Sequence, residues 1–467
     1  MQLVKTINDP VHGTIGITKL EARLINTKAF QRLRNVRHLS LAYLVYPSAN
    51  FSRLSHSIGV CHVTGRLLES LRKNSPNLAL DEKEEQLYRL AGLLHDIGHY
   101  PFSHPMEDAV KNYCARKKVL VETSSSGEGV SIGKYEYYNH EEVGAFVLEN
   151  DPEIMAILEE ERIAPRAIHS IFNREDPPRF ANLISSDFDA DRIDYLLRTA
   201  HHTGLPYGKV DINYLIGQLK AGDFDGTTWL YLDHKALKAA DHFLLSRYFD
   251  NHQAAFHKTV AGFEWMLKEA LQGLLENDLI DCDVSAIRQK IENQTWLQFD
   301  DDHVTHQMHK LTEIKGADEV TKLLTSALIT RHPPKQLVEF ETLAKKGEAP
   351  FGDKKKLVGQ LVKSYAEEYG LDERLWHVWS KTVSPTKVGA HFRFDEVDDI
   401  DQDKKEQAIQ VFDQHKQRPM PIVTMKESLM SVLSNYEYNA LRLYLLLPPE
   451  KEGLLQEIKD KVFQALH

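Results

Sequence analysis

The segment LLHDIGH, residues 93–99, places His95 and Asp96 next to each other on a predicted helix. Neighbouring side chains on a helix diverge by about 100° around its axis. They can therefore share one ion only if it lies close to the helix and other segments add ligands. Leu94 and Ile97 predict a largely buried setting, where an unpaired carboxylate is costly. A metal ion is one solution and a hydrogen-bonded structural pair is the other. The dipeptide alone favours the structural pair.

Two further segments carry residues of the same chemistry. FSRLSHSIGV (51–60) places His56 at the start of an apolar helix. In ISSDFDADRIDYLLR, Asp191 shares a predicted helix face with Asp187 and Tyr195, four residues away on either side, and with Asp194. Stacked like charges destabilise a bare helix, so a cation is a natural neutraliser. Together the segments favour a metal site over the structural pair.

Helices dominate the prediction for the first 275 residues, because apolar residues recur there at helical spacing. A short apolar run at 228–232 predicts a strand, and 121–138 is rich in Gly, Ser and Tyr, as is typical of a long surface loop. The predicted helices cover residues 20–39, 56–74, 81–99, 179–200 and 235–275.

The pattern changes from residue 276. Short β-type runs at 391–394, 420–425 and 441–447 alternate with helical stretches, and an acidic, Lys-rich linker covers 395–407. We predict a mainly α fold: a helical catalytic domain over residues 1–275, with its core at 50–200, and an α+β C-terminal domain over 276–467.

Composition excludes several classes of function. The chain has 467 residues, a formal net charge of −11, and 23 His against 3 Cys. The charge argues against binding to nucleic acid or to anionic membrane through bulk attraction. The few dispersed cysteines disfavour a disulfide framework or a thiolate zinc site, so any metal must be bound by imidazole and carboxylate. Without a signal peptide or a predicted membrane span, we expect a soluble cytoplasmic protein.

His56, His95, Asp96 and Asp191 resemble, in order, spacing and flanking residues, the four metal ligands of HD-domain phosphohydrolases. The likeness is strongest to the deoxynucleoside triphosphate triphosphohydrolase branch, which includes proteins that pair a SAM domain with an HD domain. It covers roughly residues 5 to 270. It rests on NDPVHG (8–13), FQRLRNVRHL (30–39), YPSANFSRLSHSIGV (46–60), AGLLHDIGHYPFSH (91–104), NHEE (139–142), DADRIDYLLR (189–198) and SRYF…HK (246–258).

The resemblance implies one divalent ion held by these four residues. Two imidazoles and two carboxylates suit Mn, Fe, Co, Ni or Zn, whereas Mg usually prefers more oxygen ligands. His99, His104 and His140 match the family's phosphate-lining and proton-moving histidines. His104 would protonate the departing 5′-oxygen, oriented by Glu107, which stands where the family usually has Asp.

Substrate contacts follow from the same likeness. Arg53 and Arg247 match phosphate-contacting arginines, whose planar fork suits phosphate. Arg192 stands beside the metal Asp, where the family often has Lys or Arg. Tyr195, beside the sugar, is retained.

Several positions depart from the family pattern. Near the sugar 3′-hydroxyl the family typically has Gln and Leu, and this chain has His38 and Leu39. A second sugar contact, usually Asp, is Thr199, and a Tyr that packs under the sugar is replaced by Ala255. These changes leave sugar selectivity open. At the family's allosteric nucleotide site two positions match, Gln31 and Arg34, but the base-reading Asp is replaced by Asn26.

The leading hypothesis is therefore a metal-dependent nucleotide phosphohydrolase that releases nucleoside and inorganic triphosphate from a (deoxy)nucleoside triphosphate. The alternatives are an HD nucleotidase or alarmone-type hydrolase of another phosphate ester, and a nucleotide-binding regulator with a structural metal. The resemblance also implies a homodimer or homotetramer.

Overall fold

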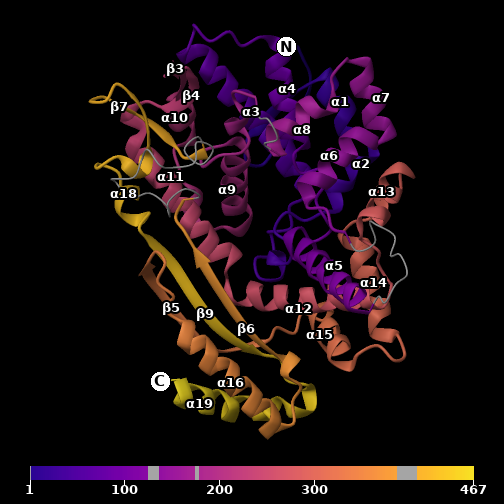
Figure 1. The fold of residues 1–467 in the computed structure, drawn as a ribbon. Helices are drawn as coiled ribbons and strands as arrows, with labels where there is room; N and C mark the ends of the chain where they lie inside the picture. Colours follow the sequence, from indigo (N-terminus) through magenta and orange to yellow (C-terminus); the bar gives the residue numbers. More distant parts are fainter. Residues whose placement is uncertain (1, 125–135, 174–177, 387–406, 467) are drawn as a thin grey trace.

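The computed structural model describes residues 2–124, 136–173, 178–386 and 407–466 (Figure 1). Helices form most of the first part of the chain and three small sheets accompany them, so the predicted mainly α fold with an α+β C-terminal region is confirmed. The predicted strand at 391–394 and most of the linker at 395–407 lie outside the described residues.

The N-terminal region contains two β-hairpins among its helices. Strands β1 (Leu3–Asp9) and β2 (Gly13–Thr18) form one antiparallel hairpin, and β3 (Leu219–Phe224) and β4 (Thr227–Leu232) form another. The helices are α1 (Lys19–Ile25), α2 (Lys28–Gln31), α3 (Arg53–Asn74), α4 (Glu82–Leu94), α5 (His104–Ser124), α6 (His140–Asn150), α7 (Pro152–Glu160), α8 (Pro165–Asn173), α9 (Ala190–Thr203), α10 (Ile212–Gly217), α11 (Leu237–Asp250) and α12 (Lys258–Glu276).

The later part of the chain builds two sheets. Strand β9 (Tyr436–Leu445) lies between β5 (Lys335–Lys345) and β6 (Trp376–Val383), antiparallel to both. Strands β7 (Gln410–Asp413) and β8 (Arg418–Pro421) extend the β3–β4 hairpin into a four-stranded sheet. The helices are α13 (Val284–Glu292), α14 (Asp301–Glu313), α15 (Glu319–Ile329), α16 (Gly352–Tyr369), α18 (Met430–Leu433) and α19 (Leu455–Leu466).

One large apolar core runs through both halves of the chain. It includes residues from Ile15 to Leu446 and joins α13–α15 to the N-terminal helices. A second core lies between the β5–β9–β6 sheet and helices α16 and α19, at the lower edge of Figure 1. The predicted division at residue 275 stays a prediction. The apolar core includes residues on both sides of that position.

Four predicted helices are shorter or more broken than expected. The predicted helix at 20–39 divides because Asn26 ends α1 and the Thr27 hydroxyl caps α2. The 179–200 helix begins only at Ala190, because the Asp189 side chain accepts the backbone N–H of Arg192 and caps the first turn. Asp187 therefore precedes the helix, and the prediction that it shares a helix face with Asp191 is wrong.

The chain also leaves the predicted helix at 81–99 early. Helix α4 ends at Leu94, so His95 and Asp96 lie in the turn beyond it. Gly98 explains the turn, since a Cβ there would lie 2.2 Å from backbone atoms of α6. The predicted helix at 235–275 is interrupted by a π-helical turn, Asn251–Ala255.

The strand and loop predictions had mixed outcomes. The run at 228–232 lies within β4, and 441–447 lies largely within β9. The run at 420–425 is strand only to Pro421 and then forms a 3₁₀ turn. The predicted loop at 121–138 begins as helix, since α5 continues to Ser124, and its central part lies outside the described residues.

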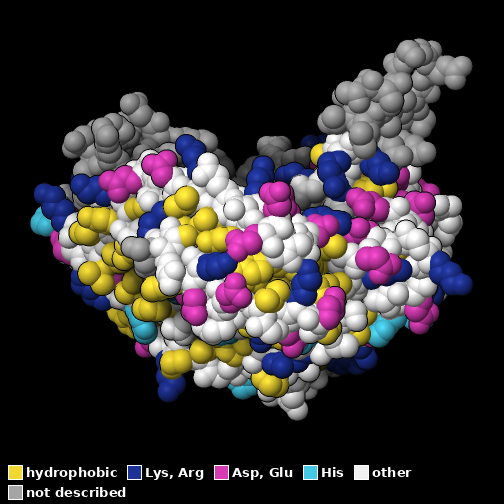
Figure 2. Space-filling view, turned by 90° about the horizontal axis from the view of Figure 1, so that it is seen from below, with side chains coloured by type: hydrophobic (Ala, Val, Ile, Leu, Met, Phe, Trp, Pro, Cys, Tyr) yellow, Lys and Arg dark blue, Asp and Glu magenta, His cyan; other side chains and the backbone are white. Residues whose placement is uncertain are grey.

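The surface seen in Figure 2 mixes basic, acidic and apolar side chains, with neither sign forming a continuous field on that face. Within the described ranges, no helix is both long enough and apolar enough to cross a bilayer.

Candidate metal centre and catalytic site

Three segments that are distant in sequence bring the four predicted metal ligands together. His56 comes from α3, His95 and Asp96 follow α4, and Asp191 lies in the first turn of α9. His56 Nε2 lies 3.0 Å from Asp191 Oδ1 and 3.7 Å from Asp96 Oδ2. His95 Nε2 lies 3.3 Å from Asp96 Oδ1 and 3.9 Å from Asp191 Oδ1.

These separations fit one divalent ion. Ligands about 2.1 Å from a metal lie roughly 3.0–3.5 Å apart when they occupy neighbouring coordination positions. Nε2 of His56 and Nε2 of His95 are both buried and have no well-formed hydrogen bond within the described part of the chain. A cation would satisfy both nitrogens. His56, His95 and Asp191 offer ligand atoms that lie within 4.8 Å of one another, so this group can hold a divalent metal ion, and Asp96 as the fourth ligand stays a prediction.

The other ring nitrogen of each histidine is already fixed. His56 Nδ1 bonds Asp194 Oδ2 at 2.7 Å, and His95 Nδ1 bonds the carbonyl oxygen of Gly92 at 2.9 Å. Such bonds select the tautomer whose Nε2 lone pair would be free to bind a metal ion.

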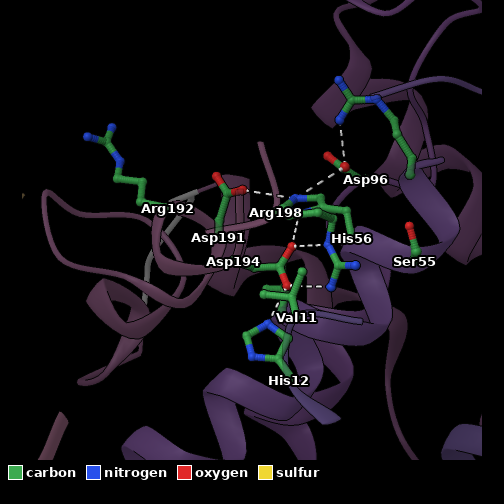
Figure 3. A network of polar contacts seen from close by, with 12 residues as sticks. Val11, His12, Ser55, His56, Asp96, Asp191, Arg192, Asp194 and Arg198 are labelled. Atoms are coloured by element: carbon green, nitrogen blue, oxygen red, sulfur yellow. Dashed lines mark hydrogen bonds and ion pairs between the residues drawn. The ribbon is translucent and has the colours of Figure 1, made fainter. Parts of the chain in front are cut away.

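Asp194 lies at the centre of a buried network (Figure 3). Arg198 donates two hydrogen bonds of 2.8 Å to its carboxylate, and His12 Nε2 bonds Oδ1 at 2.7 Å. Asp9 accepts from Arg198 NH1 at 2.8 Å. Burial alone would raise the pKa of Asp194, but Arg198 and the histidine hydrogen bonds hold it well below its usual range. Asp194 is thus an anion that orients His56.

The NDPVHG segment, residues 8–13, has a structural role in this network. The Asp9 carboxylate accepts the backbone N–H groups of Val11 and His12, both at 2.9 Å. That turn carries the His12 imidazole to Asp194. Asp9, His12, Asp194 and Arg198 were not among the predicted site residues. The quoted NDPVHG motif and the i,i+4 pair of Asp194 with Arg198 were the available signals.

A second cluster adjoins the metal ligands. The rings of His99 and His140 stack at 4.0 Å, and that of His104 meets both edge-on. Glu107 Oε2 accepts from His140 Nδ1 at 2.9 Å and lies 3.4 Å from His104 Nδ1. The Tyr137 hydroxyl donates to Glu107 Oε1 at 2.7 Å.

Glu107 therefore orients two imidazoles at once. Burial would raise its pKa, but hydrogen bonds from His104, His140 and Tyr137 lower it far below the usual range, so the group is anionic. His104 has a side chain 67% exposed, which leaves its ring accessible to a bound molecule. Tyr137 is a further residue that the sequence did not indicate.

The loop between these clusters is strained and firmly held. Phe102 and Ser103 both adopt positive φ, 54° and 61°. Asp301, on α14, accepts the Phe102 N–H at 2.7 Å, and Ser103 Oγ accepts from Arg53 Nε at 2.8 Å. Arg53 also donates to Asp96 at 2.5 Å. A residue from beyond position 275 thus positions the loop that carries His99 and His104.

A cavity of about 400 Å³ joins the two clusters. Among the predicted substrate contacts, its lining includes His38, Leu39, Arg53, Arg192 and Tyr195. The His38 ring also lies 4.3 Å from that of His56.

Other predicted residues lie elsewhere. Thr199 is fully buried, Ala255 is exposed in the π-helical turn, and neither lines the cavity. Arg247 is buried and donates to Asp187 at 3.1 Å. Arg192 does line the cavity, but it is bound to the same carboxylate at 3.1 Å and points away from the candidate metal ligands in Figure 3. For all of these, a role in substrate binding stays a prediction.

The three predicted allosteric residues lie around α1 and α2, outside this cavity. Gln31 donates to the carbonyl oxygen of Ile25 at 2.6 Å and accepts from Arg34 at 2.5 Å. Asn26 is exposed and ends α1. Their allosteric role likewise stays a prediction.

Comparison with known families now identifies the architecture. Residues 53–197 match the family described as "HD domain". The chain thus contains a segment, residues 53–197, that belongs to the HD-domain family. The match encloses all four candidate metal ligands and the three clustered histidines, and the predicted kinship with HD phosphohydrolases is confirmed.

Curated relatives of this HD-domain protein include enzymes. The deoxynucleoside triphosphate triphosphohydrolase SAMHD1 of Homo sapiens is 32% identical over 216 residues, which are 43% of this chain and 34% of that protein. An uncharacterized protein of Mycoplasma genitalium is 32% identical over 286 residues, 58% of this chain and 61% of the relative. The chain thus spans only about half to three fifths of the first curated relatives it matches.

Solved structures share the fold along nearly the whole chain. A hypothetical protein from Aquifex aeolicus has a TM-score of 0.69 at 24% identity, covering 98% of this chain and 99% of its own. A phosphohydrolase from Bacteroides thetaiotaomicron has a TM-score of 0.66 at 23% identity, covering 95% and 100%. The fold that this chain shares with these two structures therefore includes the C-terminal region.

Proposed function

We propose that the protein is a metal-dependent nucleotide phosphohydrolase, and that its main reaction converts a (deoxy)nucleoside triphosphate into nucleoside and inorganic triphosphate. One observation carries the proposal: the buried Nε2 atoms of His56 and His95, which have no well-formed hydrogen bond among the described residues, lie with two carboxylates and a histidine cluster beside one cavity. The similarity to SAMHD1 proteins, which are named as triphosphohydrolases, supports this choice of reaction.

A divalent ion bound by the four ligands would polarise a phosphoryl oxygen and lower the pKa of a bound water. The protein supplies the remaining chemistry. Arg53, fixed by Asp96 and Ser103 through NH1 and Nε, lines the cavity with its other amino group left for a phosphate oxygen. His104, oriented by Glu107, would donate a proton to the departing 5′-oxygen. The stacked rings of His99 and His140 offer hydrogen-bond donors to the phosphates.

The charge of the cavity supports a second candidate. Its lining contains two arginines, Arg53 and Arg192, and five carboxyl groups, those of Asp96, Glu141, Asp189, Asp191 and Asp250. Burial raises the pKa of Asp189 to about 6 and that of Asp250 to about 7, which reduces the negative charge. The cavity still has more carboxyl groups than arginines. This excess favours a less charged ester, such as a nucleoside monophosphate, unless a polyphosphate binds as a complex with a cation.

A substrate panel separates these reactions. Full-length protein is loaded with Mn²⁺, Co²⁺, Ni²⁺, Zn²⁺ or Mg²⁺, incubated with dNTPs, NTPs, guanosine tetraphosphate and monophosphates, and the products are resolved by chromatography. Triphosphate release supports the main proposal, and orthophosphate or pyrophosphate supports the second candidate. Nucleotide-dependent thermal stabilisation without turnover under any metal would instead indicate a regulator and overturn both. Manganese as the preferred metal, a dimeric or tetrameric state and a cytoplasmic location stay predictions.

A further inference from the structure

The cavity extends beyond the phosphate-handling residues to the end of α11. Asp250, the last residue of that helix, and Asn251 line this end together with Tyr195. Asp250 is only 7% exposed, so its small exposed surface faces the cavity that it lines. No step of the proposed hydrolysis uses this carboxyl group.

Asp250 is held in place but not neutralised. The Tyr207 hydroxyl, itself nearly buried, donates to Asp250 Oδ1 at 2.6 Å. Arg247, one helical turn earlier, is the nearest potential cation on α11, but its guanidinium bonds Asp187 at 3.1 Å. Within the described part of the chain, Asp250 forms no ion pair, and Tyr207 is its one side-chain hydrogen-bond partner. The second carboxyl oxygen therefore remains available to a molecule in the cavity.

The buried carboxyl group of Asp250 restricts which part of a nucleotide can bind beside it. A buried carboxyl group repels phosphate and attracts a group that donates hydrogen bonds. A nucleotide has such donors only on its sugar and base, and its phosphates belong at the metal end. Burial raises the pKa of Asp250 to about 7, so near neutral pH the group is present in both forms and can also donate. A hydroxyl group, which both donates and accepts, suits either form.

The residue predicted to contact the sugar from α9 does not reach the cavity. Thr199 is fully buried, and its hydroxyl has no hydrogen-bond partner among the described residues. His38 and Tyr195 line the cavity, and a further polar contact to the sugar is available from another element. Asp250 approaches from α11, beside Tyr195.

We propose that Asp250, oriented by Tyr207, is a specificity-determining residue that binds a sugar hydroxyl group of the nucleotide. The inference rests on the proposed function. It predicts that the enzyme distinguishes substrates by their sugar hydroxyl groups, because these groups bind the Asp250 carboxyl group at the end of α11. Removal of that carboxyl group should abolish the distinction.

The test compares NTPs, dNTPs and 2′,3′-dideoxy-NTPs as substrates of the wild type, Asp250→Ala and Tyr207→Phe. The wild type should prefer a hydroxyl-bearing substrate over its dideoxy analogue by about 10–100-fold in kcat/KM. In Asp250→Ala, kcat/KM should fall about 10–100-fold for hydroxyl-bearing substrates and stay unchanged for the dideoxy analogue. Tyr207→Phe should give a smaller change in the same direction. Asp241→Asn is the matched control, because Asp241 is a buried carboxylate of α11 that bonds Ser428 and does not line the cavity.

Equal losses for all substrates in Asp250→Ala, or a wild type that does not discriminate, would overturn the inference. Failure of the proposed function is a different result, namely no turnover by the wild type. A binding measurement separates the two: calorimetric titration with deoxynucleosides and with their dideoxy counterparts should show a hydroxyl preference that Asp250→Ala removes. If Asp250→Ala does not fold, Tyr207→Phe provides the test: its kcat/KM should fall more for hydroxyl-bearing substrates than for the dideoxy analogue.

Discussion

His56 has two ring nitrogens with different partners, and this difference suits it to the proposed role of metal ligand. Its Nδ1 is bound to Asp194, and its Nε2 lies 3.0 Å from Asp191 without a well-formed hydrogen bond. Without metal, burial would lower the pKa of His56, but Asp191 and Asp194 outweigh it and raise the pKa to about 9. A metal ion that binds Nε2 would therefore have to displace a proton from this ring.

Asp194→Asn should weaken metal binding about 10–100-fold, because the ring of His56 loses its anionic partner. The side chain keeps its shape, so the helices should remain packed. Metal affinity is measured by titration of the metal-free protein, with circular dichroism as the folding control. Asp241→Asn, which removes a buried carboxylate away from the cavity, should bind metal like the wild type. Unchanged affinity in Asp194→Asn would exclude the proposed orienting role.

Glu107→Gln should separate proton transfer from metal binding. An amide cannot accept from His104, His140 and Tyr137 as the carboxylate does, so the imidazoles lose their common anion. We expect kcat to fall about 10²–10⁴-fold, the usual contribution of general acid–base catalysis, with bound metal unchanged. Steady-state kinetics and metal analysis on the same preparation check this. Loss of metal together with activity would mean that Glu107 acts through the metal centre instead.

At the scale of elements, the contact between α3 and α9 sets the metal geometry. A Cβ on Gly59 would lie 1.8 Å from Asp194 Oδ1 and 2.5 Å from Arg198 NH2. The absence of a side chain at this position lets the two helices approach closely enough for His56 and Asp191 to share an ion.

Gly59→Ala should therefore force α3 and α9 apart, destabilise the fold by roughly 1–3 kcal/mol or more, and reduce metal binding. Gly359→Ala on α16 is the matched control, since its Cβ would meet nothing within 4 Å. That control should be neutral or stabilise the protein by up to about 1 kcal/mol, the ordinary helix preference of Ala over Gly. Equal unfolding midpoints in denaturant for the two variants would contradict the packing argument.

Asp301 connects α14 to the strained loop at Phe102. Burial raises its pKa to about 6, although the backbone N–H groups of Phe102 and Arg37 favour the ionised form. Since an unfolded Asp has a pKa near 3.9, the folded state holds the extra proton between the two values, and this stabilisation is lost as pH rises through about 6.

The stability of the wild type relative to Asp301→Asn should thus decrease by on the order of 2 kcal/mol between pH 4.5 and 7. Chemical denaturation of both proteins at several pH values measures this difference. A difference that does not vary with pH would rule out titration of Asp301 in this range.

The sequence was informative where local rules apply. His56, His95, Asp96 and Asp191 could be located by motif and spacing, and they converge in the structure. Element ends were less predictable: α9 starts late because Asp189 caps it, and α4 stops early because Gly98 packs against the α6 backbone. Helical periodicity records neither capping nor close backbone contact.

Contacts between residues far apart in the chain could not be predicted from the sequence, for a different reason. Asp194 contacts His12 across 182 residues, and Asp301 contacts Phe102 across 199. Tyr207 lies outside the predicted helices, so its hydrogen bond to Asp250 could not be inferred from helical spacing. Such pairs arise from the folded arrangement of elements, which spacing along a single segment does not reveal.

At the scale of the whole molecule, charge and architecture direct an anionic substrate to one place. The net charge is −11, and the face in Figure 2 mixes both signs. An anionic substrate would therefore be captured locally, by the metal ion and a few fixed side chains. The apolar core that spans both halves of the chain supports that site, since Asp301 on α14 holds the loop at Phe102.

Metal-dependent hydrolysis by the full-length chain tests the central claim most directly. Wild type and Asp96→Asn are each assayed for phosphate and triphosphate release from nucleotides, after chelation and again after Mn²⁺ addition, with bound metal quantified in parallel. The account predicts turnover by the metal-loaded wild type, loss on chelation, recovery with Mn²⁺, and at least a hundredfold lower rate in Asp96→Asn. Turnover that survives chelation, or that Asp96→Asn retains in full, would contradict it.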